Sequence, residues 1–295
     1  MFTRLSALSA RGGEAVQCAR SVAERSQREV KDRRKGADIS AGAEPAVGGS
    51  VVESIAAVGG GAFVLVSLVL GVRLLMLAAR THEIPELACG LGLLLMGAVG
   101  YPLVAITQQV SGLPTALRVG LLIVQMLCHV VGNTALCIFT LRVFRPDAAW
   151  ARGLTAAVLL AVVTSIAIQM ASPGLAAFVE NGRGIWRFHG GIAIVPLLWT
   201  GFESLRYRGL LQRRRKLGLA DAVIVNRFQL WAAGMLLAAS VTVVSISLEL
   251  QGQTMVDVPI GGLAIGVLGT LCSGAMWLAF MPPATYTRWL AARQA

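Results

Sequence analysis

From residue 52 onward the chain alternates between long apolar stretches and short polar or charged ones. A membrane-spanning helix needs about 20 mostly apolar residues. Seven stretches reach that length, and each ends at charges, prolines or glycines, as helices do. The pattern therefore predicts an all-α transmembrane bundle with spans at residues 52–79, 84–106, 115–141, 150–171, 185–207, 222–250 and 259–280.

The connections between these stretches contain residues typical of helix ends. Thr81 is predicted to cap the second helix, with Pro85 in its first turn. Gly218 followed by Asp221 predicts the end of one helix and the start of the next, so the fifth helix should continue past the membrane before the sixth begins. Gly262, Gly266, Gly269 and Ser273 share one face of the seventh helix, which predicts close packing against a neighbour.

Residues 1–50 have a different pattern, with nine Lys or Arg, six Asp or Glu and no apolar run of ten residues. Mixed charge with few large apolar side chains predicts a disordered basic segment, and the missing apolar core excludes a secretory signal. Because the apolar pattern starts abruptly near Val51, an alternative interpretation is that translation starts downstream of Met1. Residues 51–295 are expected to form a single membrane domain.

Composition agrees with a membrane protein, since 56% of the residues are hydrophobic and 14% are charged, against about 25% charged in soluble domains. The formal net charge of +11 comes mainly from arginines that flank the apolar stretches. Such residues anchor loops at anionic lipid headgroups. The predicted partner of this charge is therefore the lipid bilayer and not a nucleic acid.

The basic residues are distributed unequally between the two sides of the predicted bundle. The first, third and fifth loops, the C-terminus and the adjoining helix ends contain 14 Lys or Arg, whereas the other loops and helix ends contain three. Cytoplasmic loops are enriched in Lys and Arg. The N-terminus is therefore predicted to lie outside and the C-terminus in the cytoplasm.

A polar seam interrupts the third predicted span. Gln125, His129 and Asn133 recur every four residues and so share one helix face, which Arg118 extends outward. Ionisable groups at membrane depth are functional-site candidates. Two interpretations stay open: a ligand, proton or sensing site, or hydrogen bonds between neighbouring helices.

A basic cluster follows the fifth span and contains no acidic residue. Its members are Arg206, Arg208, Arg213, Arg214, Arg215 and Lys216. Either the cluster only anchors the topology at anionic lipid, or it belongs to a helical hairpin that contacts a cytoplasmic protein. Glu203, just before the cluster, is expected to pair with Arg206 at helical spacing.

Several activities can be argued against from the residues present. Retinal needs a membrane-buried lysine, but the chain has only Lys31, Lys35 and Lys216. The three histidines, His82, His129 and His189, are predicted at three different depths, which disfavours a haem held by two of them. No GxSxG, HExxH, phosphate-loop or CxxC motif occurs. We therefore expect no cofactor, no metal site and no enzymatic activity.

Three segments resemble bacterial seven-helix membrane proteins of uncharacterised activity. They are Val72-Arg73-Leu74-Leu75 through Arg80-Thr81-His82-Glu83-Ile84-Pro85-Glu86-Leu87 and on to Tyr101-Pro102, then Ala220-Asp221 through Asn226-Arg227-Phe228, then Phe280-Met281-Pro282-Pro283. The resemblance covers residues 52–290 and implies an architecture in the bacterial inner membrane, but it implies no activity. A seven-span receptor is a further analogy, although its usual Asp-Arg-Tyr and Asn-Pro-x-x-Tyr signatures are missing.

Together these features predict an integral inner-membrane protein that acts as a sensor, a receptor-like protein or an accessory component through a separate cytoplasmic partner. The alternative is a small-solute or ion transporter. An odd span number and the lack of a centrally placed acidic residue disfavour that alternative.

Overall fold

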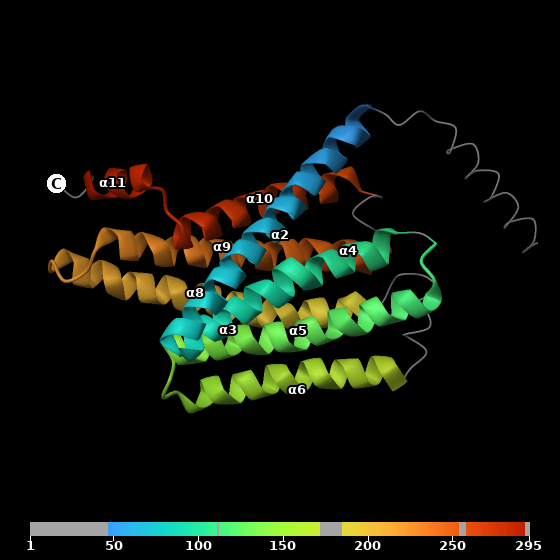
Figure 1. Cartoon of the computed structure of the whole chain (residues 1–295), viewed down its shortest axis with the longest axis horizontal. Coiled ribbons are helices and arrows are strands. Elements are labelled where there is room, and N and C mark those ends of the chain that lie inside the picture. Colours follow the sequence, from blue (N-terminus) through green and yellow to red (C-terminus); the bar gives the residue numbers. More distant parts are fainter. Residues whose placement is uncertain (1–46, 111, 172–184, 254–257, 293–295) are drawn as a thin grey trace, which may run out of the picture. The chain divides into compact units, whose positions relative to one another are not determined.

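A computed structural model describes residues 47–110, 112–171, 185–253 and 258–292, and every regular element in this part of the chain is a helix (Figure 1). The elements are α2 (Val47–Thr81), α3 (Ile84–Gly92), η1 (Leu93–Gly100), α4 (Tyr101–Gln109), α5 (Thr115–Phe144), α6 (Ala149–Ala171), α8 (Ile185–Lys216), α9 (Ala222–Leu250), α10 (Pro259–Phe280) and α11 (Ala284–Ala292).

Six helical segments are long and apolar enough to span a membrane. They are Val51–Thr81, Ile84–Thr107, Thr115–Phe144, Ala149–Ile168, Ala222–Leu250 and Pro259–Phe280. Their number and hydropathy indicate a multi-pass membrane protein with a helical bundle. The expectation of disorder for residues 1–50 falls outside the described residues, except that 47–50 belong to α2.

The sequence pattern predicted one regular α-helix for the second span, but the structure has three consecutive helical segments there, α3, η1 and α4. Between α3 and α4 the eight residues of η1 form a π-helix, and the Tyr101 N–H donates to the carbonyl of Met96, five residues back. Pro102 follows directly and has no N–H to give to the preceding turn. A wider π turn accommodates this missing donor, and π turns inside α-helices are frequent at functional sites.

Two of the predicted helix ends can be compared with the structure. Thr81 does not cap the second helix: it is the last residue of α2, and Glu83 occupies the cap position of α3, although Pro85 does lie in the first turn. The Gly218–Asp221 prediction is confirmed, since Gly218 has φ of +72° and the Asp221 carboxylate accepts a hydrogen bond from Val223 N at 2.9 Å. The chain therefore turns sharply from α8 into α9.

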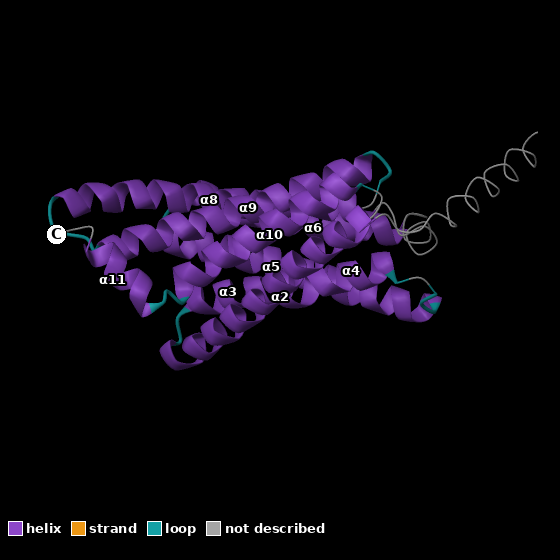
Figure 2. Ribbon diagram, turned by 90° about the horizontal axis from the view of Figure 1, so that it is seen from above, coloured by secondary structure: helices purple, strands orange, loops and turns teal. Residues whose placement is uncertain are grey.

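Helices α8, α9 and α10 pack in sequence, and α5 contacts α3, η1, α6 and α8 (Figure 2). The main core cluster draws side chains from α2, α3, α5, α8, α9 and α10, among them Leu70, Cys89, Leu136, Leu197, Trp231 and Met276. The predicted small-residue face of α10 packs against α2, where Gly266 meets the backbone of Ile55 and Ala56. This face is a packing surface.

Candidate functional site

The polar seam on α5 faces the interior of the bundle. Gln125, His129 and Asn133 are buried, with Gln125 at 3% and Asn133 at 1% exposure. The Asn133 amide N–H donates to the His129 carbonyl at 2.8 Å, which uses one donor within the helix. No described residue donates to Gln125 Oε1 or Asn133 Oδ1, and both atoms are buried. A buried acceptor without a hydrogen-bond donor lowers the stability of the fold by about 1–3 kcal/mol unless water or a ligand supplies the donor.

Arg118, the fourth residue of the predicted seam, lies two turns before Gln125 on α5. Its guanidinium is half-buried near the start of α5 and donates to the Val110 carbonyl at 3.3 Å, at the end of α4. Arg118 therefore links the end of α4 to α5.

The π-helix η1 packs against α5 at the level of the seam. Gly132 of α5 leaves space that the side chain of Met96 of η1 fills, and a Cβ at Gly100 would lie 3.8 Å from that of Cys128. The irregular backbone in the second span therefore lies next to the polar residues of the third. Sequence reasoning missed this arrangement, and Pro102 was the available signal.

Closer to the α5 C-terminus, two threonines connect α5 to α8. The hydroxyls of Thr140 and Thr200 lie 2.6 Å apart, and both residues are fully buried. Thr140 Oγ1 also lies 2.9 Å from the Leu136 carbonyl, and Thr200 Oγ1 lies 2.7 Å from the Pro196 carbonyl. Each hydroxyl has one proton, so at any moment two of these three contacts are hydrogen bonds. Thr140 is 11 residues beyond His129 and on the same helix face.

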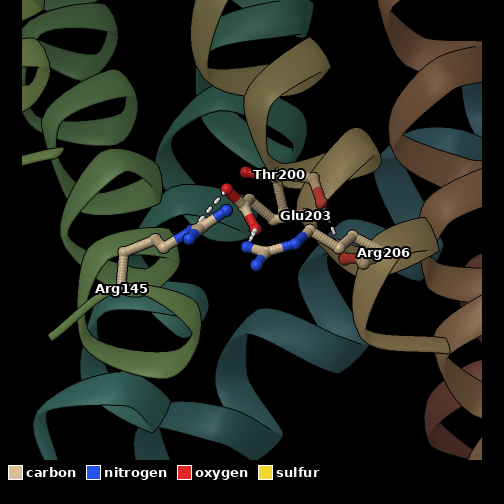
Figure 3. Close-up of polar contacts among 5 residues, drawn as sticks. Arg145, Thr200, Glu203 and Arg206 are labelled. Atoms are coloured by element: carbon tan, nitrogen blue, oxygen red, sulfur yellow. Dashed lines mark hydrogen bonds and ion pairs between the residues drawn. The ribbon is translucent and has the colours of Figure 1, made fainter. Parts of the chain in front are cut away.

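One turn beyond Thr200, Glu203 is buried between two arginines (Figure 3). Glu203 Oε1 accepts a hydrogen bond from Arg145 Nε at 2.7 Å, and Glu203 Oε2 lies 3.5 Å from an Arg206 nitrogen. The predicted pair with Arg206 is confirmed, but the shorter contact comes from Arg145 at the end of α5. Sequence spacing gave no signal for a partner 58 residues away.

Arg145 also contacts α6 through the ring of Trp150. Its guanidinium lies 5.4 Å from the centroid of the Trp150 ring, and that ring lies 5.9 Å from the Trp199 ring of α8. A cation over the face of an indole is attracted by the ring quadrupole. Arg145, Glu203 and Trp150 therefore hold the end of α5 and the start of α6 against the middle of α8.

Aromatic rings continue these contacts to α9 and α10. The Tyr207 ring lies 4.7 Å from Phe228 and 5.7 Å from Phe144, and Trp231 lies 5.1 Å from Phe280, all as ring-centroid distances. Tilted and edge-on pairs of this kind add about 0.5–1.5 kcal/mol each beyond the area they bury. The same end of the bundle is thus well packed as well as basic, and we call it the basic end: the turns after α2, α5, α8 and α10 with their adjoining helix termini (Figure 1).

The predicted basic cluster lies at the end of α8 and is only partly involved in these contacts. Arg206 pairs with Glu203 and Arg208 is half-buried, whereas Arg213, Arg214, Arg215 and Lys216 are exposed. Within the described part of the chain, both ion pairs involve Glu203, so none neutralises residues 213–216. The seam and the basic cluster are therefore separate, with Thr140, Thr200 and Glu203 between them.

The described residues contain no cluster of metal-ligating side chains and no disulfide. Within those ranges no three His, Cys, Asp or Glu side chains gather as metal ligands, and Cys89, Cys128, Cys137 and Cys272 are buried free thiols. Cys18 and the side chain of His189 lie outside what the structure describes.

Comparison with known proteins finds no matching protein-family model, no matching curated protein and no matching solved structure.

Proposed function

We propose that this chain is a seven-span inner-membrane protein that acts as a sensor, receptor-like or accessory component through a separate cytoplasmic protein. The observation behind the proposal is that α8 is one continuous helix with two different parts. Its first part packs on α5, which contains the buried seam, and its last part is exposed and strongly basic. We assign no catalytic step to either part.

The proposal takes α8 as the seventh span. Between Arg187 and Glu203, the 15 residues 188–202 contain no Asp, Glu, Lys or Arg. The helix also contacts α5, α6 and α9, which are all candidate spans. A crossing α8 puts the α8–α9 turn on the same side as the other basic turns, with the N-terminus outside and the C-terminus in the cytoplasm.

Contacts along α8 give a physical route for signalling. Thr200 and Glu203 contact Thr140 and Arg145 of α5, and the same helix continues to Lys216 without interruption. The part of α8 from Thr200 to Lys216 lies beyond Pro196 and contains no proline that would kink it. A ligand that repositions α5 at the seam would therefore also displace the basic end of α8. Such coupling requires that the ligand binds the two positions of α5 with different affinity.

Copurification from native membranes tests the proposal. We expect the variant Arg213→Gln/Arg214→Gln/Arg215→Gln to keep its topology and lose at least four-fifths of a copurifying cytoplasmic protein. The matched control is Arg142→Gln/Arg152→Gln/Arg288→Gln, which removes the same charge from exposed positions of the basic end outside the hairpin. Equal recovery of every bound protein by both variants and the parent would leave these arginines as topology anchors and reject the proposal.

A transporter is the second candidate, and the buried seam favours it. Gln125 Oε1 and Asn133 Oδ1 lack donors among the described residues, and η1 provides irregular backbone beside them. Transporters place polar groups and broken helices at their substrate sites. Solute or ion flux in proteoliposomes that is reduced at least tenfold by Asn133→Leu would support transport, and absence of flux with a copurifying partner would support signalling.

A further inference from the structure

We propose that the tip of the α8–α9 hairpin is a docking surface for an acidic protein with an apolar cleft. Leu217 and Leu219 would enter the cleft, and the surrounding basic side chains would contact carboxylates at its rim. The inference rests on the proposed function and adds to it the chemistry of the partner and the residues that bind it.

The hairpin is a packed element of the fold. Leu211 of α8 and Ala222 and Val225 of α9 are buried, and the Tyr207 and Phe228 rings lie 4.7 Å apart between the same two helices. At the turn, Leu219 N–H donates to the Arg214 carbonyl at 3.0 Å. These contacts give the tip a fixed shape, which lowers the entropy that binding must remove.

Helix α11 supports the hairpin from the side. The Asn226 amide donates to the Tyr286 hydroxyl at 2.8 Å, and Tyr286 stacks on Trp289 with ring centroids 5.9 Å apart. The support reaches α9 within one turn of its start at Ala222. Residues 213–219 at the tip are all exposed in the described part of the chain.

The tip presents large apolar side chains among unneutralised charges. Leu217 is 73% exposed and Leu219 is 74% exposed, and Arg213, Arg214, Arg215 and Lys216 directly precede them. Residues 206–220 contain no acidic residue. An apolar centre with a charged rim is the arrangement of a protein-binding surface, in which the centre gives affinity and the rim gives orientation and association rate.

Helix length favours a protein over the lipid surface as the occupant. A span of about 20 residues crosses the hydrocarbon core, so a span that begins directly after Arg187 ends near Tyr207. The remaining nine residues of α8 reach about 14 Å further at 1.5 Å per residue. The headgroup layer is only about 5–8 Å thick on each side. The tip therefore lies beyond the headgroups, where exposed leucines contact water unless a protein covers them.

Photocrosslinking in the full chain identifies the occupant. A photoreactive amino acid at position 217 or 219 in native membranes should form an adduct with one and the same protein, and Arg213→Gln/Arg214→Gln/Arg215→Gln should abolish it. Leu160, exposed on α6, is the control position and should form phospholipid adducts. Phospholipid adducts at both 217 and 219 would overturn the inference in favour of a membrane surface.

A second variant separates the inference from the proposed function. Leu217→Ser/Leu219→Ser keeps every charge and removes only the apolar side chains. We expect it to reduce recovery of the crosslinked protein at least tenfold, with an unchanged thermal midpoint because both side chains are exposed. Full recovery with this variant and loss with the arginine variant would reject the apolar contact while the proposed function stood. Full recovery with both variants would reject both.

Discussion

At the residue scale, the packing of α2 on α10 depends on glycines that allow backbone contact. A Cβ placed on Gly266 would lie 2.7 Å from the Ile55 carbonyl oxygen and 2.9 Å from the Ala56 Cα. Lipid provides no hydrophobic drive between helices, so close backbone approach is a main source of attraction. Backbone atoms cannot rotate away as a flexible side chain can. Gly266 should therefore tolerate no side chain.

Alanine substitution at two glycines of α10 tests this contact. We expect Gly266→Ala to reduce the free energy of unfolding by about 1–3 kcal/mol, because the added methyl overpacks the interface. Gly274→Ala should be neutral or stabilise by up to about 1 kcal/mol through helix propensity, since nothing lies within 4 Å of its Cβ position. Unfolding in detergent mixtures measures both, and equal stability of the two variants would contradict the packing assignment.

Glu203 shows how much one buried carboxylate can contribute between helices. Its two oxygens contact Arg145 and Arg206, and their guanidinium groups remain partly exposed to solvent. Removing one partner of a buried pair is costly because the other charge stays desolvated. Partial exposure of the arginines reduces that cost.

A double-mutant cycle measures the contribution of the Arg145–Glu203 pair. We expect Glu203→Gln and Arg145→Gln each to lower the free energy of unfolding by about 1–3 kcal/mol. The double variant should lower it by less than the sum of the two single variants. Arg142→Gln is the control, since Arg142 is exposed one turn before Arg145 on α5. Additive costs would mean that the two side chains do not stabilise each other.

At the element scale, local signals predicted helix positions well and interhelical contacts poorly. The ranges 222–250 and 259–280 coincide with α9 and α10, because Asp221 precedes α9, Pro259 begins α10 and Pro282-Pro283 follows it in the sequence. The π-helix η1 was missed because an apolar stretch predicts a span whether its backbone hydrogen bonds follow the α or the π pattern. Arg145 was missed as the partner of Glu203 because no local pattern links residues 58 apart.

The α5 seam was only partly predictable, because local spacing indicates a helix face but not what packs against it. A spacing of four residues places Gln125, His129 and Asn133 on one face, and the structure buries that face. Which helix lies opposite was not predictable, since it depends on how η1 and α8 pack on α5. Thr140 shares this face, but it is seven residues from Asn133 and has an apolar residue, Leu136, between. Its link to Thr200 needed the tertiary structure.

Cysteine labelling tests the orientation of α5. In a chain whose five native cysteines are replaced by serine or alanine, we expect a lipid-soluble maleimide to label Leu127→Cys at least tenfold faster than His129→Cys. Leu127 is 58% exposed, whereas His129 is buried two residues away on the same helix. Equal labelling rates would show that the seam faces lipid, and a ligand or sensing role would then have no support.

At the scale of the whole molecule, the side on which the α8–α9 turn lies depends on α8. If α8 did not cross, the alternation of the six apolar segments would place the cluster from Arg213 to Lys216 on the side opposite to the turns after α2 and α5. That arrangement would conflict with the enrichment of Lys and Arg in cytoplasmic loops. A crossing α8 brings these basic segments to one side, and the basic end in Figure 1 has the same grouping.

Reporter fusions decide between six and seven spans, with the sites before and after α8 as the informative pair. We expect an enzymatically active phosphatase, which requires export, at Leu113 and Asn181, and a fluorescent protein, which requires the cytoplasm, at Gly218. The physical reason is that 15 uncharged residues precede Glu203 in α8, and the helix packs on three candidate spans. If α8 does not cross, Asn181 and Gly218 report the same side. An active phosphatase at both sites would put the basic hairpin outside the cytoplasm, and the docking surface at Leu217 and Leu219 would have to be abandoned along with the seventh span.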